Sequence, residues 1–105
     1  MQTFCETRLF SRLVQQYLSD DEYADLQQFL AKRPEAGSVI PASGGVRKLR
    51  WTSRGRGKRG GLRVIYFLRM AEGEIWMLTL YAKNVEENIP VGVLRQIKEE
   101  IDGTR

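Results

Sequence analysis

Arg63 is the residue of this sequence whose setting points most directly to chemistry. It lies inside the apolar run at residues 62–68, LRVIYFL, where a permanently charged guanidinium needs a partner or an open groove. If Arg63 lies in an open groove, it is a candidate functional residue. The alternative interpretation places Arg63 on an exposed sheet face without a chemical role.

Other basic residues surround Arg63 in a long window without acids. No Asp or Glu occurs between Glu35 and Glu72, whereas nine of the 17 Lys and Arg residues fall there. These nine are Arg47, Lys48, Arg50, Arg54, Arg56, Lys58, Arg59, Arg63 and Arg69. If the fold presents them on one surface, they form an electrostatic footprint for a polyanion such as nucleic acid. A solvated basic loop without a specific ligand is the alternative.

The residue types also exclude several classes of enzyme. With no His and with Cys5 as the single cysteine, the chain cannot form a Ser-His-Asp triad or a His/Cys zinc site. The glycine-rich segment 55–61 lacks the spacing GxxxxGKS or GxxxxGKT of a phosphate-binding loop. We expect no metal ion and no cofactor, and we expect Cys5 to be a small core residue.

Length and composition predict one domain, residues 1–105, because two cores of half this size would each be too small. No apolar stretch approaches the roughly 20 residues of a membrane span. Glu6 and Arg8 interrupt the first ten residues, so no signal-peptide core is present. These features predict a cytoplasmic location without membrane contact.

Hydrophobic periodicity predicts that a strand at residues 3–6 leads into a helix hairpin. Apolar residues recur at helical spacing through residues 9–18. The segment SDDE at 19–22 matches a capping box, which starts a second helix, and Pro34 ends that helix.

The second half of the chain predicts a meander and a last helix. A loop at 35–45 precedes an alternating strand at 46–51, in which Lys48 and Arg50 share one face. A basic glycine-rich loop at 54–61 then joins strands at 62–70 and 75–81, with a tight turn at 71–74. Pro90 is expected at the first position of the last helix. This order predicts an α+β protein, in which helices pack on a curved antiparallel sheet of about four strands. Tyr66 and Tyr81 are expected to be core or interface aromatics and not platforms on which bases stack.

Three segments together resemble a known family. They are GVRKLRW at 45–51, GKRGGLRVIY at 57–66 and LTLYAKN at 78–84, and they resemble the HigB branch of the RelE/ParE superfamily of toxins. The resemblance implies a RelE-like fold and a type II toxin that cleaves messenger RNA in the ribosomal A site. It further implies three partners: the ribosome, mRNA and a cognate HigA-like antitoxin with a helix-turn-helix domain.

The resemblance also implies roles for individual residues. Arg63 falls where the family keeps a catalytic arginine on the strand after the basic loop. Lys48 and Arg50 fall near a pair of family lysines on the preceding strand. The common Lys-Arg pair after the last strand appears here as Lys83 and Asn84, so an arginine role there would be either missing or taken by Lys83.

Cleavage of RNA needs no metal ion, because the ribose 2′-hydroxyl can attack the neighbouring phosphate. Arg63 would stabilise the phosphorane. Nearby cations disfavour a protonated lysine, so Lys48, Lys58 or Lys83 could act as the base. The expected contacts to RNA or the ribosome are Arg47, Arg54, Arg56, Arg59 and Asn84.

Two other functions stay open on the sequence. One is a RelE-fold toxin of the ParE kind, which poisons DNA gyrase, and the other is a basic RNA-binding module without catalysis. A ribonuclease requires that Arg63, Lys83 and the strand of Lys48 and Arg50 converge on one surface, whereas a gyrase poison does not.

Overall fold

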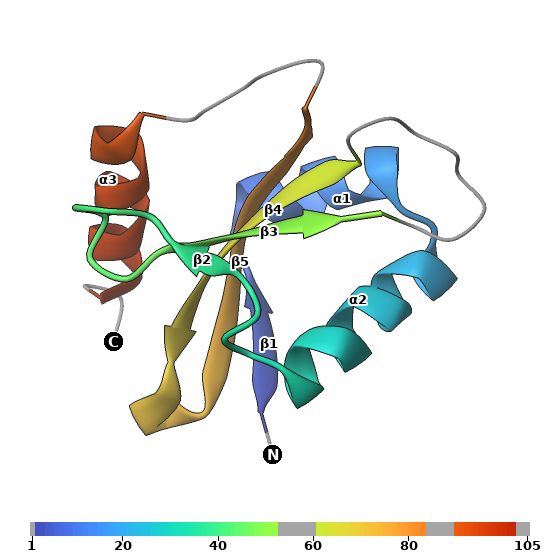
Figure 1. Ribbon diagram of the computed structural model, residues 1–105, viewed down its shortest axis with the longest axis horizontal. Coiled ribbons are helices and arrows are strands. Elements are labelled where there is room, and N and C mark those ends of the chain that lie inside the picture. The colour runs from blue at the N-terminus through green and yellow to red at the C-terminus, as the bar shows by residue number, and fades with distance from the viewer. Residues whose placement is uncertain (1, 53–60, 84–89, 103–105) are drawn as a thin grey trace.

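The computed structural model describes residues 2–52, 61–83 and 90–102, and in these ranges it forms a sheet with helices on both faces (Figure 1). The elements in chain order are β1 (Thr3–Glu6), α1 (Arg8–Tyr17), α2 (Asp20–Lys32), β2 (Ser38–Val39), β3 (Arg47–Trp51), β4 (Leu62–Arg69), a short 3-10 helix (Met70–Glu72), β5 (Glu74–Ala82) and α3 (Val91–Asp102). The predicted α+β class is confirmed.

The helix hairpin begins and turns at two side-chain caps. Thr7 caps α1, because its hydroxyl accepts a hydrogen bond from the Phe10 amide at 3.0 Å. The predicted capping box at Ser19 is confirmed. The Ser19 hydroxyl accepts from the Glu22 amide at 3.2 Å, and the Glu22 carboxylate accepts from the Ser19 amide at 2.8 Å. Each cap satisfies amides that a helix start leaves without partners.

The sheet has five strands in the order β1-β5-β4-β3-β2. The strands β2 to β5 pair antiparallel, as expected, but β1 pairs parallel to β5. The sheet is therefore mixed and has five strands, where the sequence predicted an antiparallel sheet of about four. The helix hairpin returns the chain to the far edge, so β1 lies beside the last strand, and two residues of the expected loop at 35–45 form β2.

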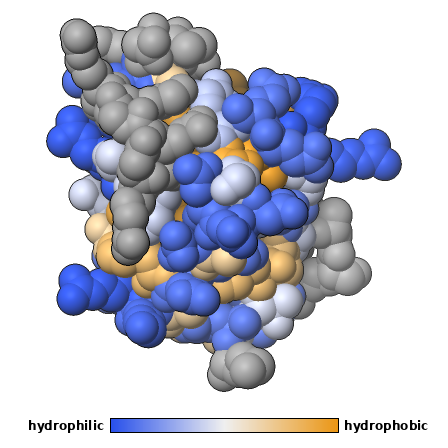
Figure 2. All heavy atoms as spheres, turned by 90° about the vertical axis from the view of Figure 1, so that its right-hand side faces the viewer, coloured by the Kyte–Doolittle hydropathy of each residue, from blue (hydrophilic) through white to orange (hydrophobic). Residues whose placement is uncertain are grey.

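Opposite faces of the sheet contact different helices. On one face, Leu49, Val64 and Met77 belong to the same core as Phe10 of α1 and Leu26 of α2. Partly buried apolar residues surround this core, and apolar surface lies between polar side chains on that side of the molecule (Figure 2).

The other face packs against α3. Val46, Ile65, Leu78 and Tyr81 of the sheet cluster there with Leu94 and Ile101 of α3. The carbonyl of Pro90 accepts hydrogen bonds from the Val93 and Leu94 amides, and α3 begins at Val91. Pro90 therefore lies one position before the helix, whereas the sequence predicted it at the first helical position. Of the described helices, none is both long and apolar enough to cross a membrane.

A β-bulge interrupts the pairing of β4 with β5. Tyr66 pairs with Met77 and Ile65 with Thr79, so Leu78 is an extra residue in β5. Before the bulge, Ile75 and Met77 face α1 and α2, whereas after it the even-numbered Leu80 and Ala82 do so. Side chains of a strand alternate between its two faces, so one extra residue exchanges the faces of all residues after it. The bulge therefore reverses which residues of β5 face α3.

Candidate functional site

Three residues form a row across the α3 face of the sheet. Arg63 of β4 pairs with Arg50 of β3 on one side and with Tyr81 of β5 on the other. Tyr81 is almost fully buried in the core against α3, and Arg63 is half-buried. Side chains directly opposite on adjacent strands have Cβ atoms about 5 Å apart. We call Arg50, Arg63 and Tyr81 the cross-strand row.

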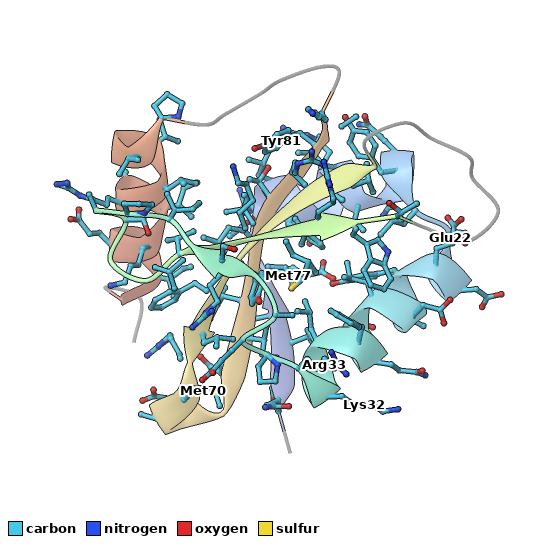
Figure 3. All side chains as sticks on the ribbon, in the orientation of Figure 1. Glu22, Lys32, Arg33, Met70, Met77 and Tyr81 are labelled. Carbon is cyan, nitrogen blue, oxygen red and sulfur yellow. The ribbon has the colours of Figure 1, made fainter. Side chains whose placement is uncertain are left out.

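The row lies at the end of the sheet where β3 stops and β4 begins. Tyr81 accordingly lies at the opposite end of β5 from Met70 (Figure 3). Trp51, the last residue of β3, packs on Phe29 of α2 with ring centroids 5.3 Å apart, which anchors this end of the strand.

Two lysines flank the row. Lys48 lies two residues before Arg50 on β3, on the same face, and pairs with Ile65. Lys83 follows directly after β5 and is exposed, and its amide donates to the Gly61 carbonyl at 3.5 Å. The structure therefore brings Lys48, Arg50 and Arg63 to one face and places Lys83 at the same end of the sheet.

Gly61, directly before β4, lies close to the end of β3 beside the row. Its φ is +61°, and a Cβ there would lie 2.6 Å from the Trp51 carbonyl oxygen and 2.7 Å from the Thr52 hydroxyl. A residue with a side chain would force the two strand ends apart. Glycine is therefore required at this position for Arg50 and Arg63 to remain neighbours.

Arg47 lies on the opposite face of the sheet from the row. Its guanidinium donates to the Gly37 carbonyl at 2.7 Å and to the Glu35 carbonyl at 3.2 Å. The buried Tyr66 hydroxyl accepts from the Gly37 amide at 2.8 Å and donates to the Pro34 carbonyl at 2.7 Å. These bonds fix the chain after α2, which gives Arg47 a structural role.

Several predicted site residues lie outside the described residues. They are Arg54, Arg56, Lys58, Arg59 and Asn84. Their roles stay predictions.

The described residues also bear on metal and thiol chemistry. Within ranges 2–52, 61–83 and 90–102, no group of three His, Cys, Asp or Glu side chains is placed to hold a metal ion. Burial, together with the negative charge of Glu74, raises the pKa of the Cys5 thiol above its ordinary value. The thiolate is the nucleophilic form, so this shift disfavours a nucleophilic role for Cys5.

Tyr81 is the member of the row that the sequence did not assign to a site. Arg69 of β4 pairs with Glu74 of β5, and without a bulge the same register would place Arg63 opposite Leu80. The bulge at Leu78 shifts the pairing by one residue and brings Tyr81 there instead. No polar residue interrupts residues 80–82, so alternation in this segment does not reveal the shift.

A phosphate group is the kind of ligand that neighbouring arginines are suited to hold. Two arginines in one cross-strand pair repel each other, and a bound anion offsets that repulsion.

Comparison with known proteins agrees with this architecture. No family model matches the chain. Among solved structures, a free-state mutant of E. coli toxin RelE with two arginines replaced by alanine is similar, with a TM-score of 0.56 over 92% of this chain and 96% of that chain. The chain has a RelE-like fold.

The RelE-like fold is what this comparison establishes. The two sequences are 13% identical, so the predicted fold is confirmed, whereas the HigB branch stays a hypothesis. Within the fold, the cross-strand row and Lys48 lie on the sheet face that α3 partly covers.

Proposed function

We propose that this protein is a RelE-type toxin of a type II toxin-antitoxin system, an endoribonuclease that cleaves messenger RNA on the ribosome. The observation behind the proposal is the pairing of Arg63 with Arg50 on a RelE-like fold, with Lys48 on the same face. A solvated basic loop without a ligand would not explain two arginines opposed on neighbouring strands.

In the proposed reaction, the ribose 2′-oxygen attacks the adjacent phosphorus and the bond from phosphorus to the 5′-oxygen breaks. The 2′-hydroxyl proton passes to a base, and the leaving 5′-oxygen takes a proton. The products are a 2′,3′-cyclic phosphate and a 5′-hydroxyl. Arg63 donates to the non-bridging oxygens as negative charge grows on them, a role that typically contributes about 10² to 10³ in rate.

Three lysines remain candidates for the base: Lys48, Lys58 and Lys83. Lys48 lies in β3, on the same face as the row. Lys83 follows the end of β5, and Lys58 lies outside the described residues. A lysine serves as base only in its neutral form, so the base must be a lysine that can give up its proton before it accepts one from the 2′-hydroxyl.

The proposed partners follow from the same assignment. Ribosomal RNA and mRNA supply the phosphates that Arg54, Arg56, Arg59 and Asn84 would contact without reading bases. We propose that the protein acts in the cytoplasm, where ribosomes are found. A nuclease of this kind requires an inhibitor in its host, for which we propose a HigA-like helix-turn-helix antitoxin.

The direct test is cleavage of a ribosome-bound message by the purified protein. We expect fragments with 5′-hydroxyl ends from the wild type, and a rate about 10² to 10³ lower from Arg63→Ala at equal folded concentration. Arg63→Lys is the matched control, because it keeps the positive charge but cannot make bidentate hydrogen bonds to a phosphate. We expect an intermediate rate.

Two outcomes would contradict the proposal. If the wild type leaves ribosome-bound mRNA intact but inhibits DNA gyrase, the protein is a toxin of the ParE kind. If it binds RNA and inhibits neither process, it is a basic RNA-binding module.

A further inference from the structure

Thr7 links the start of α1 to the β-bulge in β5. Its amide donates to the Met77 carbonyl at 3.1 Å, and its hydroxyl donates to the Leu78 carbonyl at 2.7 Å. The same hydroxyl accepts from the Phe10 amide at 3.0 Å. One side chain therefore caps the helix and binds the extra residue of the bulge.

This bond lies where the parallel pairing of β1 with β5 ends. The last registered pair is Glu6 with Met77, so the Thr7 hydroxyl extends the hydrogen bonding by one residue, to Leu78. The bulged Leu78 has no registered partner on β4 and is fully buried, so its backbone carbonyl needs a hydrogen-bond donor from elsewhere. Thr7 supplies that contact from the connection between β1 and α1.

The bulge decides which face Tyr81 occupies. Without the extra residue, Tyr81 would pair with Leu62 and point toward α1 and α2, and Leu80 would lie opposite Arg63. With it, Tyr81 lies beside Arg63 and packs in the core against α3. The geometry of the cross-strand row therefore depends on the bulge.

We propose that Thr7 is a positioning residue for Arg63. Thr7 lies at the α1 side of the sheet and acts through the Leu78 bulge and the register of β5, without contact to RNA. This inference rests on the proposed nuclease function for its effect on rate, but its effect on register can be measured independently. A shift of about 1 Å in a catalytic group can cost about 10² in rate, which sets the size of effect to look for.

The decisive variant is Thr7→Asp. An ionised carboxylate at this position still caps α1, since Asp is as good an N-cap as Thr, but it cannot donate to the Leu78 carbonyl. Thr7→Ser retains both functions and is the conservative control. Ser19→Ala is the matched control, because it removes the equivalent cap of α2 and leaves the bulge untouched.

The first readout is amide hydrogen exchange resolved by NMR on the full chain. In Thr7→Asp we expect faster exchange at Arg63 and Tyr81, beyond the bulge, and unchanged exchange at Phe67 and Trp76, a pair before it. Thr7→Ser should match the wild type. Ser19→Ala should not change the ratio between the two pairs.

The second readout is the rate of cleavage at saturating concentration, normalised to the folded fraction. We expect Thr7→Asp to lose about tenfold or more, and Thr7→Ser and Ser19→Ala to lose little. Equal exchange at Tyr81 in Thr7→Asp and the wild type would overturn the proposal. Retention of the full rate by Thr7→Asp would overturn it as well, whereas failure of the wild type to cleave RNA would overturn the nuclease function and leave the exchange result to decide this inference.

Discussion

Arg50 and Arg63 lie directly opposite each other on β3 and β4, so one cross-strand pair holds two positive charges. Like charges in this position destabilise a sheet, and screening by salt reduces the effect. We expect Arg50→Gln to raise the free energy of unfolding by up to about 1 kcal/mol at low salt, with a smaller gain at high salt. Urea unfolding at two salt concentrations measures this.

The control for that experiment is Arg47→Gln, on the same strand. Arg47 donates to the carbonyls of Glu35 and Gly37, so its removal should lower the free energy of unfolding at both salt concentrations. A loss of stability in Arg50→Gln at low salt would contradict the account of the pair.

The second prediction concerns how salt affects ribosome binding. Removing two phosphate contacts should reduce the slope of log affinity against log salt by about 1.4. We expect this change when Lys48→Gln and Arg50→Gln are combined, because both residues lie on the face of the row.

The matched control is Lys32→Gln combined with Arg33→Gln, which removes the same charge. These two exposed residues lie at the end of α2, away from Tyr81 (Figure 3). Their loss should leave the slope near that of the wild type, and equal changes in both double variants would indicate a general charge effect. The combined change of Arg54, Arg56 and Arg59 to Gln tests the predicted loop contacts in the same assay.

The third prediction concerns the buried hydroxyl of Tyr66. Tyr66→Phe leaves the Gly37 amide and the Pro34 carbonyl without their partner, and we expect it to lower the free energy of unfolding by about 1–3 kcal/mol. Tyr23→Phe is the comparison, because its hydroxyl bonds to an exposed carboxylate of Glu6 that water can solvate. A smaller loss in Tyr66→Phe than in Tyr23→Phe, measured by urea unfolding, would argue against the buried bond.

The fourth prediction concerns alkaline pH. Burial raises the pKa of Tyr66 above its ordinary value of 10.0, and burial with the Glu6 hydrogen bond raises the pKa of Tyr23. Above pH 10 the unfolded chain loses these protons while the folded chain retains them. The contribution of these groups to the free energy of unfolding is therefore fully present below pH 10 and decreases above it. For each group the decrease is about 1.4 kcal/mol per pH unit between the pKa of the unfolded chain and that of the folded chain.

Tyr66→Phe removes one of these two groups. Its free energy of unfolding should therefore decline less steeply than that of the wild type above pH 10, as urea titrations at stepped pH would measure. Parallel declines in the two proteins would show that the Tyr66 proton does not contribute.

Local sequence rules predicted most of the elements. The alternation in 46–51 correctly separated Lys48 and Arg50 from Leu49 and Trp51, because one face of β3 is buried against α1 and α2. The capping box at Ser19 placed the start of α2, since both of its hydrogen bonds are local.

Non-local pairing accounts for what the sequence did not predict. The parallel contact of β1 with β5 joins residues about 70 positions apart, and no local pattern encodes its direction. The same holds for Tyr81. Its place beside Arg63 depends on the bulge at Leu78, whose carbonyl accepts a hydrogen bond from Thr7, a residue that is distant in sequence.

The most direct test of the central claim is primer extension on a reporter message after induced expression of the protein in cells. Wild-type protein should arrest growth and produce cuts within the translated region. Arg63→Ala, at matched expression, should produce neither. Growth arrest without cuts in the wild type, or undiminished cutting by Arg63→Ala, would contradict the claim that the cross-strand row of this RelE-like fold cleaves RNA.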